Sequence, residues 1–311
     1  MDKKKIIIDC DPGYDDAVAL LLAAGSPSVE VLAITTVAGN QTLEKVTRNA
    51  LRIATLAGLD VPVAAGAARP LLRDEVVVAA NIHGQSGLDG TTLPQATLNP
   101  DPRHAAQLIV DTVMNEPPQS VTLVPIGPLT NIALAARLEP RIVERVKELV
   151  LMGGGYHIGN VKPMAEFNIE NDPEAAHIVF EEKWPIVMVG LDLTYQALAT
   201  QTVKDKIAAI HTPASYFVTQ VLTRFSENYK KSKGFDEPPV HDACAVAYVI
   251  DPGVIETRKA PVHVEYRGEY TSGMTVTDLR RKAPQDCHTA VAMKLDRERF
   301  WNLVIEAVGN L

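Results

Sequence analysis

The chain has 311 residues, of which 46% are hydrophobic and 22% are charged, and its formal net charge at pH 7 is −8. These values are typical of a globular protein with one large α/β domain or two ordinary ones, and the acidic balance argues against a nucleic-acid ligand. Three scattered cysteines, a short apolar start and no apolar stretch longer than residues 17–25 predict a cytoplasmic protein without disulfides, signal peptide or membrane partner.

Short apolar runs alternate with helical patterns in the first two thirds of the chain. Each run is nearly all apolar, as expected for strands that helices cover on both faces. The order predicts a mostly parallel, doubly wound, Rossmann-like open sheet flanked by helices. The predicted strands are Lys5–Asp9, Val31–Val37, Val61–Ala64, Val121–Pro125, Glu148–Met152 and Ile186–Leu191, and the helices include Asp16–Ala24, Leu43–Leu56, Arg103–Asn115, Asn131–Leu138 and Pro173–Glu181.

The remaining segments are more polar and less regular. Residues 202–232 predict long helices, followed after a proline-rich break by an apolar helix at Ala243–Ile250. Two late strands, Val262–Tyr266 and Ala290–Leu295, are expected to extend a sheet, and a helix at 297–308 closes the chain.

These patterns are interpreted as a single domain over residues 1–311, with residues 195–260 as a helical cap. The segment 70–102 is long and poor in regular pattern. Loops of this kind are usually functional or mobile.

The segment DCDPGYDD holds four aspartates in eight residues. Asp9 and Asp11 are two apart at a strand end, so their side chains share a face. Asp15 and Asp16 begin the next helix, where one of them could serve only as an N-cap. Buried carboxylates at one strand end repel one another, and a hard cation such as calcium or magnesium removes that cost. The segment therefore predicts a metal site.

Further polar groups follow the other predicted strands at their carboxyl ends, where open parallel sheets bind ligands. Any one of them could be a simple turn residue, so only the set is informative. They are Asp11, the TVAGN run ending at Asn40, Ile126-Gly127, Met152-Gly153 and Asp192.

Several motifs occur in order along the chain: DCDPGYDD, TTVAGNQT around Asn40, NIHG around His83, TLVPIGPLTNIA, LMGGGYHIGN followed by AEFNIENDPEAA, and VHDACAVAYVIDP at 240–252. Together they resemble the inosine–uridine preferring nucleoside hydrolases, most closely the non-specific members, from about residue 5 to residue 305. The resemblance implies an N-glycosyl hydrolase of nucleoside salvage. It would split purine and pyrimidine ribonucleosides into ribose and free base with a calcium-bound water.

The resemblance also implies roles for single residues. Asp11 would be a Ca²⁺ ligand and the base that takes a proton from the water, and Asp9 would lie behind the ligands. His241 would protonate the departing base, a role that suits a side chain with an ordinary pKa near neutrality. The other calcium ligands would be Asp16, Asp242 and the backbone carbonyl of Ile126, where many relatives carry threonine.

The same resemblance implies a set of substrate-binding residues. On the sugar side these are Asp15, Asn40, Glu166 and Asn168, which would bind ribose hydroxyls, with Met152 and Asn160 lining the pocket. His83 would lie on the base side, and Tyr229 is expected to reach the base from the cap rather than serve only in packing. Both remain candidates to assist protonation of the leaving group.

Four alternatives stand against this hypothesis. A phosphatase of the haloacid-dehalogenase type also opens with Asp-x-Asp, but Pro-Gly-Tyr-Asp-Asp follows here and no phosphate cradle is evident. A non-catalytic binding module would lack Asp11 or the His241-Asp242 pair. A purine-only enzyme would hold the base between tryptophans, and Trp184 and Trp301 are not placed for that. A pyrimidine-restricted enzyme is the remaining alternative, and the resemblance suggests a homo-oligomer, either tetramer or dimer.

Overall fold

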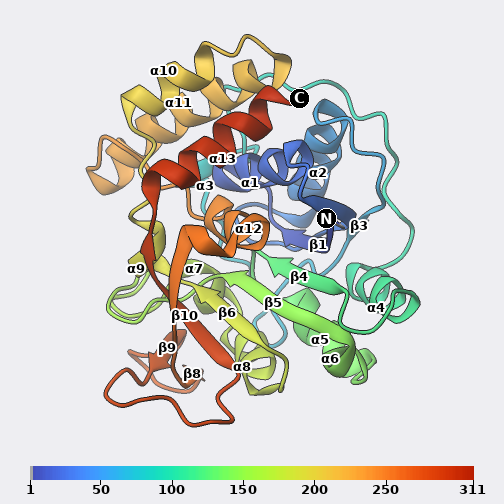
Figure 1. The fold of residues 1–311 in the computed structure, drawn as a ribbon, viewed down its shortest axis with the longest axis vertical. Helices are drawn as coiled ribbons and strands as arrows, with labels where there is room; N and C mark the ends of the chain where they lie inside the picture. The colour runs from blue at the N-terminus through green and yellow to red at the C-terminus, as the bar shows by residue number, and fades with distance from the viewer. Residues whose placement is uncertain (1–2) are drawn as a thin grey trace.

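A central eight-stranded sheet runs through residues 3–311, the part of the chain that this computed structural model describes (Figure 1). Its strands are β1 (Lys4–Cys10), β2 (Val29–Thr36), β3 (Val63–Ala65), β4 (Val121–Pro125), β5 (Val146–Met152), β6 (Ile186–Val189), β7 (Ile255–Lys259) and β10 (Thr289–Leu295). The strand order is β3-β2-β1-β4-β5-β6-β10-β7. All neighbours are parallel except β7, which is antiparallel to β10. The predicted doubly wound, mostly parallel sheet is therefore confirmed.

Helices cover both faces of this sheet (Figure 1). One face carries α1 (Tyr14–Gly25), α2 (Leu43–Leu56), α11 (Pro213–Lys233), α12 (Ala243–Ile250) and α13 (Arg297–Gly309). The other carries α4 (Ala105–Asn115), α5 (Thr130–Leu138) and α8 (Pro173–Glu181). The remaining helical segments are α3 (Ala80–His83), α6 (Ile142–Arg145), α7 (Phe167–Asn171), α9 (Leu191–Thr194), α10 (Gln201–Ala208) and η1 (Pro252–Val254).

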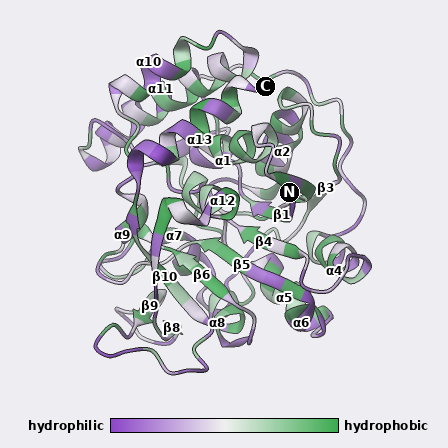
Figure 2. Ribbon diagram, in the orientation of Figure 1, coloured by the Kyte–Doolittle hydropathy of each residue, from purple (hydrophilic) through white to green (hydrophobic). Residues whose placement is uncertain are grey.

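The alternation of side chains along each strand builds two hydrophobic cores. In β1, Ile6 and Ile8 join the core on the α1 face, whereas Ile7 joins the core on the α4 face. Successive residues of a strand point to opposite faces, so a strand buried on both faces must be apolar throughout. Figure 2 shows hydrophobic residues along the central strands and hydrophilic ones mainly on peripheral loops and outer helix faces. Within the described range, no helix is both long and apolar enough to cross a membrane.

The predicted strand at Val262–Tyr266 is present, but it lies outside the main sheet. β8 (Val262–Glu265) pairs only with β9 (Met274–Thr277), in a separate antiparallel hairpin. Val262 and Val264 are buried against the α8 side, while His263 between them is exposed. This alternation is typical of a strand with one solvated face. The other late strand, Ala290–Leu295, does join the main sheet, as β10.

The topology brings the predicted site residues together. The chain passes from β1 outward to β2 on one side and returns to β4 on the other, so the strand order reverses at β1. The carboxyl ends of β1, β2, β4 and β5 therefore meet at one edge of the sheet. In open parallel sheets, this switch point is where ligands bind.

Candidate active site

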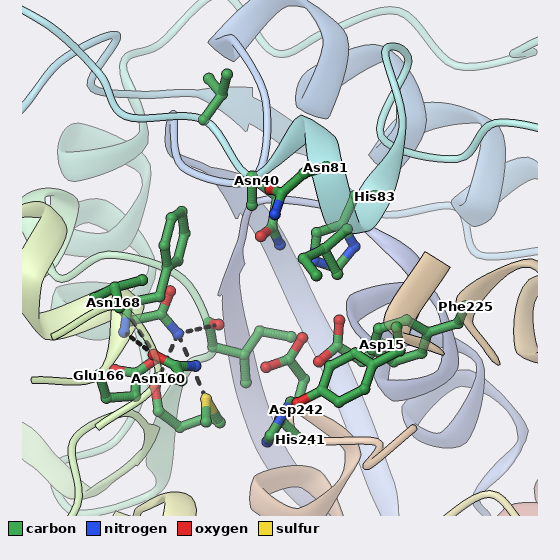
Figure 3. Close-up of a pocket in the computed structure, with 18 of the residues that line it drawn as sticks. Asp15, Asn40, Asn81, His83, Asn160, Glu166, Asn168, Phe225, His241 and Asp242 are labelled. Atoms are coloured by element: carbon green, nitrogen blue, oxygen red, sulfur yellow. Dashed lines mark hydrogen bonds between the residues drawn. The ribbon is translucent and has the colours of Figure 1, made fainter. Parts of the chain in front are cut away.

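A cavity of about 180 Å³ opens at this edge of the sheet (Figure 3). Its walls come from the residues that follow β1, β2, β4 and β5, from α3 and its preceding loop, and from α11 and the start of α12. The lining residues are Asp15, Asn40, Val77, Val78, Ala79, Asn81, Ile82, His83, Ile126, Met152, Asn160, Val161, Glu166, Phe167, Asn168, Phe225, Tyr229, Lys233, His241 and Asp242.

The structure brings together the thirteen residues to which the sequence assigned a catalytic, metal-binding or substrate-binding role. Eleven of the thirteen line the cavity directly, and Asp11 and Asp16 are the two that do not. Both are fully buried, and both contact a lining residue, Asn40. The backbone N–H of Asn40 donates to Asp11 Oδ2, and its side-chain amide donates to Asp16 Oδ2 at 3.0 Å. The amide nitrogen of Asn40 is thus engaged by the aspartates, and its Oδ1 accepts no hydrogen bond from the described residues.

The acidic residues form a buried cluster. Carboxylate oxygens of Asp15, Asp16 and Asp242 lie within 4.8 Å of one another. Asp16 Oδ1 accepts the backbone N–H of Asp11 at 3.0 Å, and Asp16 Oδ2 accepts that of Gly13 at 2.9 Å. Asp16 therefore lies in the first turn of α1, which begins two residues earlier than predicted, and it helps to cap that helix.

Among residues 3–311, no side-chain cation balances the charge of this cluster. None of Asp11, Asp15, Asp16 and Asp242 forms an ion pair there with a lysine or arginine. Burial, and then repulsion from Asp16, raises the pKa of Asp11 well above its usual range and that of Asp15 to about 8. Burial and the neighbouring aspartates also raise the pKa of Asp242. A cation among these carboxylates would reverse the effect, because it stabilises their charged forms.

The donor set fits a hard divalent cation. Asp11 Oδ1 is buried and has no hydrogen-bond partner among the described residues. The carbonyl of Ile126 accepts one hydrogen bond, from Asn168 Nδ2 at 2.9 Å, and a carbonyl oxygen has a second lone pair. A Cβ on Gly127 would lie 2.7 Å from Asp11 Oδ1, so a glycine is needed there for the carboxylate to fit. Carboxylates and a backbone carbonyl are the ligands that calcium prefers.

Glu166 and Asn168 form the opposite wall of the cavity. Glu166 is the N-cap of α7 and accepts backbone N–H groups of Asn168, Ile169 and Gly154. Burial outweighs these bonds and raises the pKa of Glu166 to about 7. Asn168 Nδ2 also donates to the carbonyl of Met152 at 3.1 Å. These hydrogen bonds fix the side chains of Glu166 and Asn168 in the cavity wall.

The two cavity histidines are each bonded through Nδ1. His83 Nδ1 accepts the backbone N–H of Tyr14 at 3.0 Å, an approach that needs Gly13, whose Cβ would lie 2.3 Å from that nitrogen. His241 Nδ1 lies 2.7 Å from Thr194 Oγ1. Burial lowers the pKa of each histidine to about 3. The pKa of His241 therefore differs from the expected value near neutrality, because the imidazole is buried.

Some cavity residues were not predicted from the sequence. Phe225 lies one helical turn before Tyr229 on α11, and their rings meet edge-on with centroids 5.5 Å apart. The i, i+4 spacing could have identified Phe225, since such pairs share a helix face. Phe167 lies between two predicted residues, and Lys233 Nζ donates to the carbonyl of Asn160 at 2.8 Å.

Three residues considered in the sequence lie away from the cavity. Asp192 accepts the backbone N–H of Tyr156 at 2.7 Å and so supports a turn. Asp9 accepts hydrogen bonds from Thr35 and Asn131 behind the acidic cluster. Trp184 is fully buried and its indole N–H donates to a backbone carbonyl, as befits a core residue.

Comparison with known proteins gives one consistent result. Residues 6–302 match the model of a family described as inosine-uridine preferring nucleoside hydrolase. The chain is 55% identical over 310 residues to the enzyme of that name from Crithidia fasciculata, covering 99% of this chain and 98% of that protein. It is 45% identical over 303 residues to a pyrimidine-specific ribonucleoside hydrolase from Salmonella typhimurium, covering 97% of each. A purine-preferring ribonucleoside hydrolase from Gardnerella vaginalis superposes with a TM-score of 0.92 at 33% identity, over 98% of each chain.

Proposed function

The chain belongs to the inosine-uridine preferring nucleoside hydrolase family and is a ribonucleoside hydrolase, and from this premise we propose that it accepts both purine and pyrimidine ribonucleosides. The observation that carries the proposal is a cavity that brings a cluster of buried aspartates together with His241 and the aromatic rings of Phe225 and Tyr229. Glycosidic hydrolysis needs both kinds of group, because a water must be activated to attack the sugar while a donor stabilises the departing base. Membership of the family excludes the haloacid-dehalogenase alternative.

We propose that Asp11, Asp16, Asp242 and the carbonyl of Ile126 hold one Ca²⁺ ion. When bound, the cation supplies positive charge that lowers the pKa of a water and orients it. Asp11 takes a proton from the attacking water at Oδ1, the buried oxygen that has no hydrogen-bond partner within residues 3–311. The glycine at 127 leaves room for this atom.

The remaining residues bind and orient the nucleoside. Polar groups buried against the sugar stabilise the transition state when they bind hydroxyls remote from the breaking bond. At the other end, His241 supplies the donor that stabilises the departing base, and His83 and Tyr229 face the same region. The proposed ribose-binding residues are Asp15, Asn40, Glu166 and Asn168, with Met152 and Asn160 lining the sugar pocket.

A pyrimidine-restricted specificity is the second candidate. It is favoured by the 45% identity to a hydrolase described as pyrimidine-specific, whereas the 55% identity to an inosine-uridine preferring enzyme favours breadth. Neither Trp184 nor Trp301 lines the cavity, so a pair of tryptophans does not hold the base. One hydrolase domain with a cap at 195–260, a homo-oligomer and a cytoplasmic location remain predictions from the sequence.

A substrate panel separates the two candidates. We expect kcat/KM for inosine and uridine to fall within about one order of magnitude of each other, with adenosine, guanosine and cytidine also hydrolysed. Metal analysis of the same purified sample should find about one calcium per chain, since residues 3–311 contain one such cluster of acidic donors. Hydrolysis of uridine and cytidine with no detectable turnover of any purine nucleoside would establish the pyrimidine-restricted alternative.

A further inference from the structure

A residue outside the cavity holds the imidazole of His241. Thr194, the last residue of α9, is fully buried and does not line the cavity, but its Oγ1 lies 2.7 Å from His241 Nδ1. The ring of Tyr195 packs nearly perpendicular to the imidazole, at 83° and a centroid distance of 5.5 Å. Since Nδ1 is directed to Thr194 and the ring lines the cavity, the Nε2 edge is the one left to face the substrate space.

The direction of this hydrogen bond follows from the lack of any other partner. A hydroxyl has one hydrogen to donate, and a neutral imidazole carries its hydrogen on only one nitrogen. Among the described residues, Thr194 Oγ1 has no hydrogen-bond partner except His241 Nδ1. If Nδ1–H were the donor, the hydroxyl hydrogen of Thr194 would be buried without an acceptor, which is costly. The hydroxyl therefore donates to Nδ1.

We propose that Thr194 is a positioning residue that holds His241 in the tautomer with its hydrogen on Nε2, so that a neutral imidazole presents an N–H donor to the departing base. The proposal rests on the proposed role of His241 at the base. As the C–N bond breaks, its electron pair moves onto the base, and a hydrogen bond from Nε2–H to a base acceptor stabilises that charge. A neutral imidazole can act in this way without giving up its proton.

His83 provides an internal comparison for this tautomer. Its Nδ1 accepts a backbone N–H, that of Tyr14, which can only donate. The tautomer of His83 is therefore also the one with hydrogen on Nε2. Both histidines line the cavity.

The tautomer can be measured directly by ¹⁵N NMR of the full chain labelled at its eight histidines. The signals of His241 and His83 are assigned by their loss in His241→Ala and His83→Ala. We expect both residues in the wild type to show a protonated Nε2 and an unprotonated Nδ1. The Thr194→Ser variant keeps the donor and should keep this pattern. In Thr194→Val the ring loses the bond that fixes it, and a second tautomer or an averaged signal should appear. A wild-type His241 protonated on Nδ1 would overturn the proposal, whether or not any variant folds.

Kinetics test the consequence for catalysis. Thr194→Val should lower kcat for inosine by about tenfold or more, because positioned donors contribute ~10²–10⁴-fold. Turnover of p-nitrophenyl riboside should change less than about twofold, since its phenolate departs without a donor. Thr194→Ser should recover inosine turnover. The matched control is Thr289→Val, because Thr289 is buried in β10, its hydroxyl donates to the carbonyl of Ala260, and it does not line the cavity.

The outcomes separate this proposal from the proposed function. Equal losses on both substrates in Thr194→Val, at unchanged metal content, would make Thr194 a structural residue and overturn the proposal. If His241→Ala slows the two substrates equally, the role of His241 at the base is wrong. In that case the NMR measurement still decides whether Thr194 fixes the tautomer.

Discussion

Replacing Gly127 with alanine tests whether Asp11 Oδ1 is placed for catalysis. The new Cβ would lie 2.7 Å from Asp11 Oδ1 and 3.0 Å from Val37 Cγ1, whereas ordinary contact begins at 3.4 Å. The carboxylate must therefore move by about 0.7 Å or the β4 end must shift. A displacement of ~1 Å in a catalytic group can cost about 10²-fold, so we expect kcat to fall ~10- to 100-fold. Overpacking of this kind also lowers the free energy of unfolding by ~1–3 kcal/mol.

The loss in Gly127→Ala should be the same for inosine and p-nitrophenyl riboside, because both need an activated water. Steady-state kinetics with both substrates, denaturant unfolding and metal analysis of the same sample provide the test. Gly253→Ala is the matched control, since its Cβ would lie 3.0 Å from the flexible end of Arg299, away from the cavity. The control should keep wild-type kcat. Wild-type kcat and metal content in Gly127→Ala would show that the position of Asp11 Oδ1 does not govern the reaction.

Three further predictions follow from the cavity. Chelation of divalent metal should abolish hydrolysis and added Ca²⁺ should restore it, because no lysine or arginine among residues 3–311 forms an ion pair with the acidic cluster. Full activity in metal-free protein would contradict the site. Uridine should exceed 2′-deoxyuridine in kcat/KM by up to ~10⁴-fold, since the missing hydroxyl leaves buried polar groups unpaired, and comparable values would show that Asp15, Glu166 and Asn168 do not bind that hydroxyl. Asp11→Ala should slow the hydrolysis of inosine and of p-nitrophenyl riboside alike. His241→Ala should slow the hydrolysis of inosine by ~10²–10⁴-fold and leave that of p-nitrophenyl riboside nearly unchanged. Equal losses on the two substrates in both variants would refute the division of roles between Asp11 and His241.

Elements with strong local signals were predicted closely from the sequence. Leu43–Leu56, Pro173–Glu181 and Ala243–Ile250 are helices with the predicted bounds, and Val121–Pro125 is a strand with the predicted bounds. The edge strand Ile255–Lys259 was missed because four of its five residues are exposed, so it lacks the apolar run that marks the other strands. Such an edge strand is defined by its pairing with β10, which no local pattern records.

The positions of several site residues could also be predicted from the sequence. Asp11, Asn40 and Ile126 could be placed together because each follows a parallel strand, and the carboxyl ends of such strands meet. The chemical state of the histidines could not be predicted, because it depends on burial and on single atoms far away in the sequence. The partner of His241 Nδ1 is 47 residues away, and that of His83 Nδ1 is 69 residues away.

These distant contacts fix both histidines in the same orientation, which their sequence motifs do not predict. Each Nδ1 is turned away from the cavity toward a hydrogen-bond donor, a threonine hydroxyl in one case and a backbone N–H at the start of α1 in the other. Burial keeps both rings neutral at pH 7, because it lowers their pKa to about 3. A neutral ring with a bonded Nδ1 can offer only Nε2–H to a ligand. The base side of the cavity is therefore lined by N–H donors of fixed orientation. Such donors suit the carbonyl and ring-nitrogen acceptors of purine and pyrimidine bases. This match supports the broad specificity proposed for the enzyme.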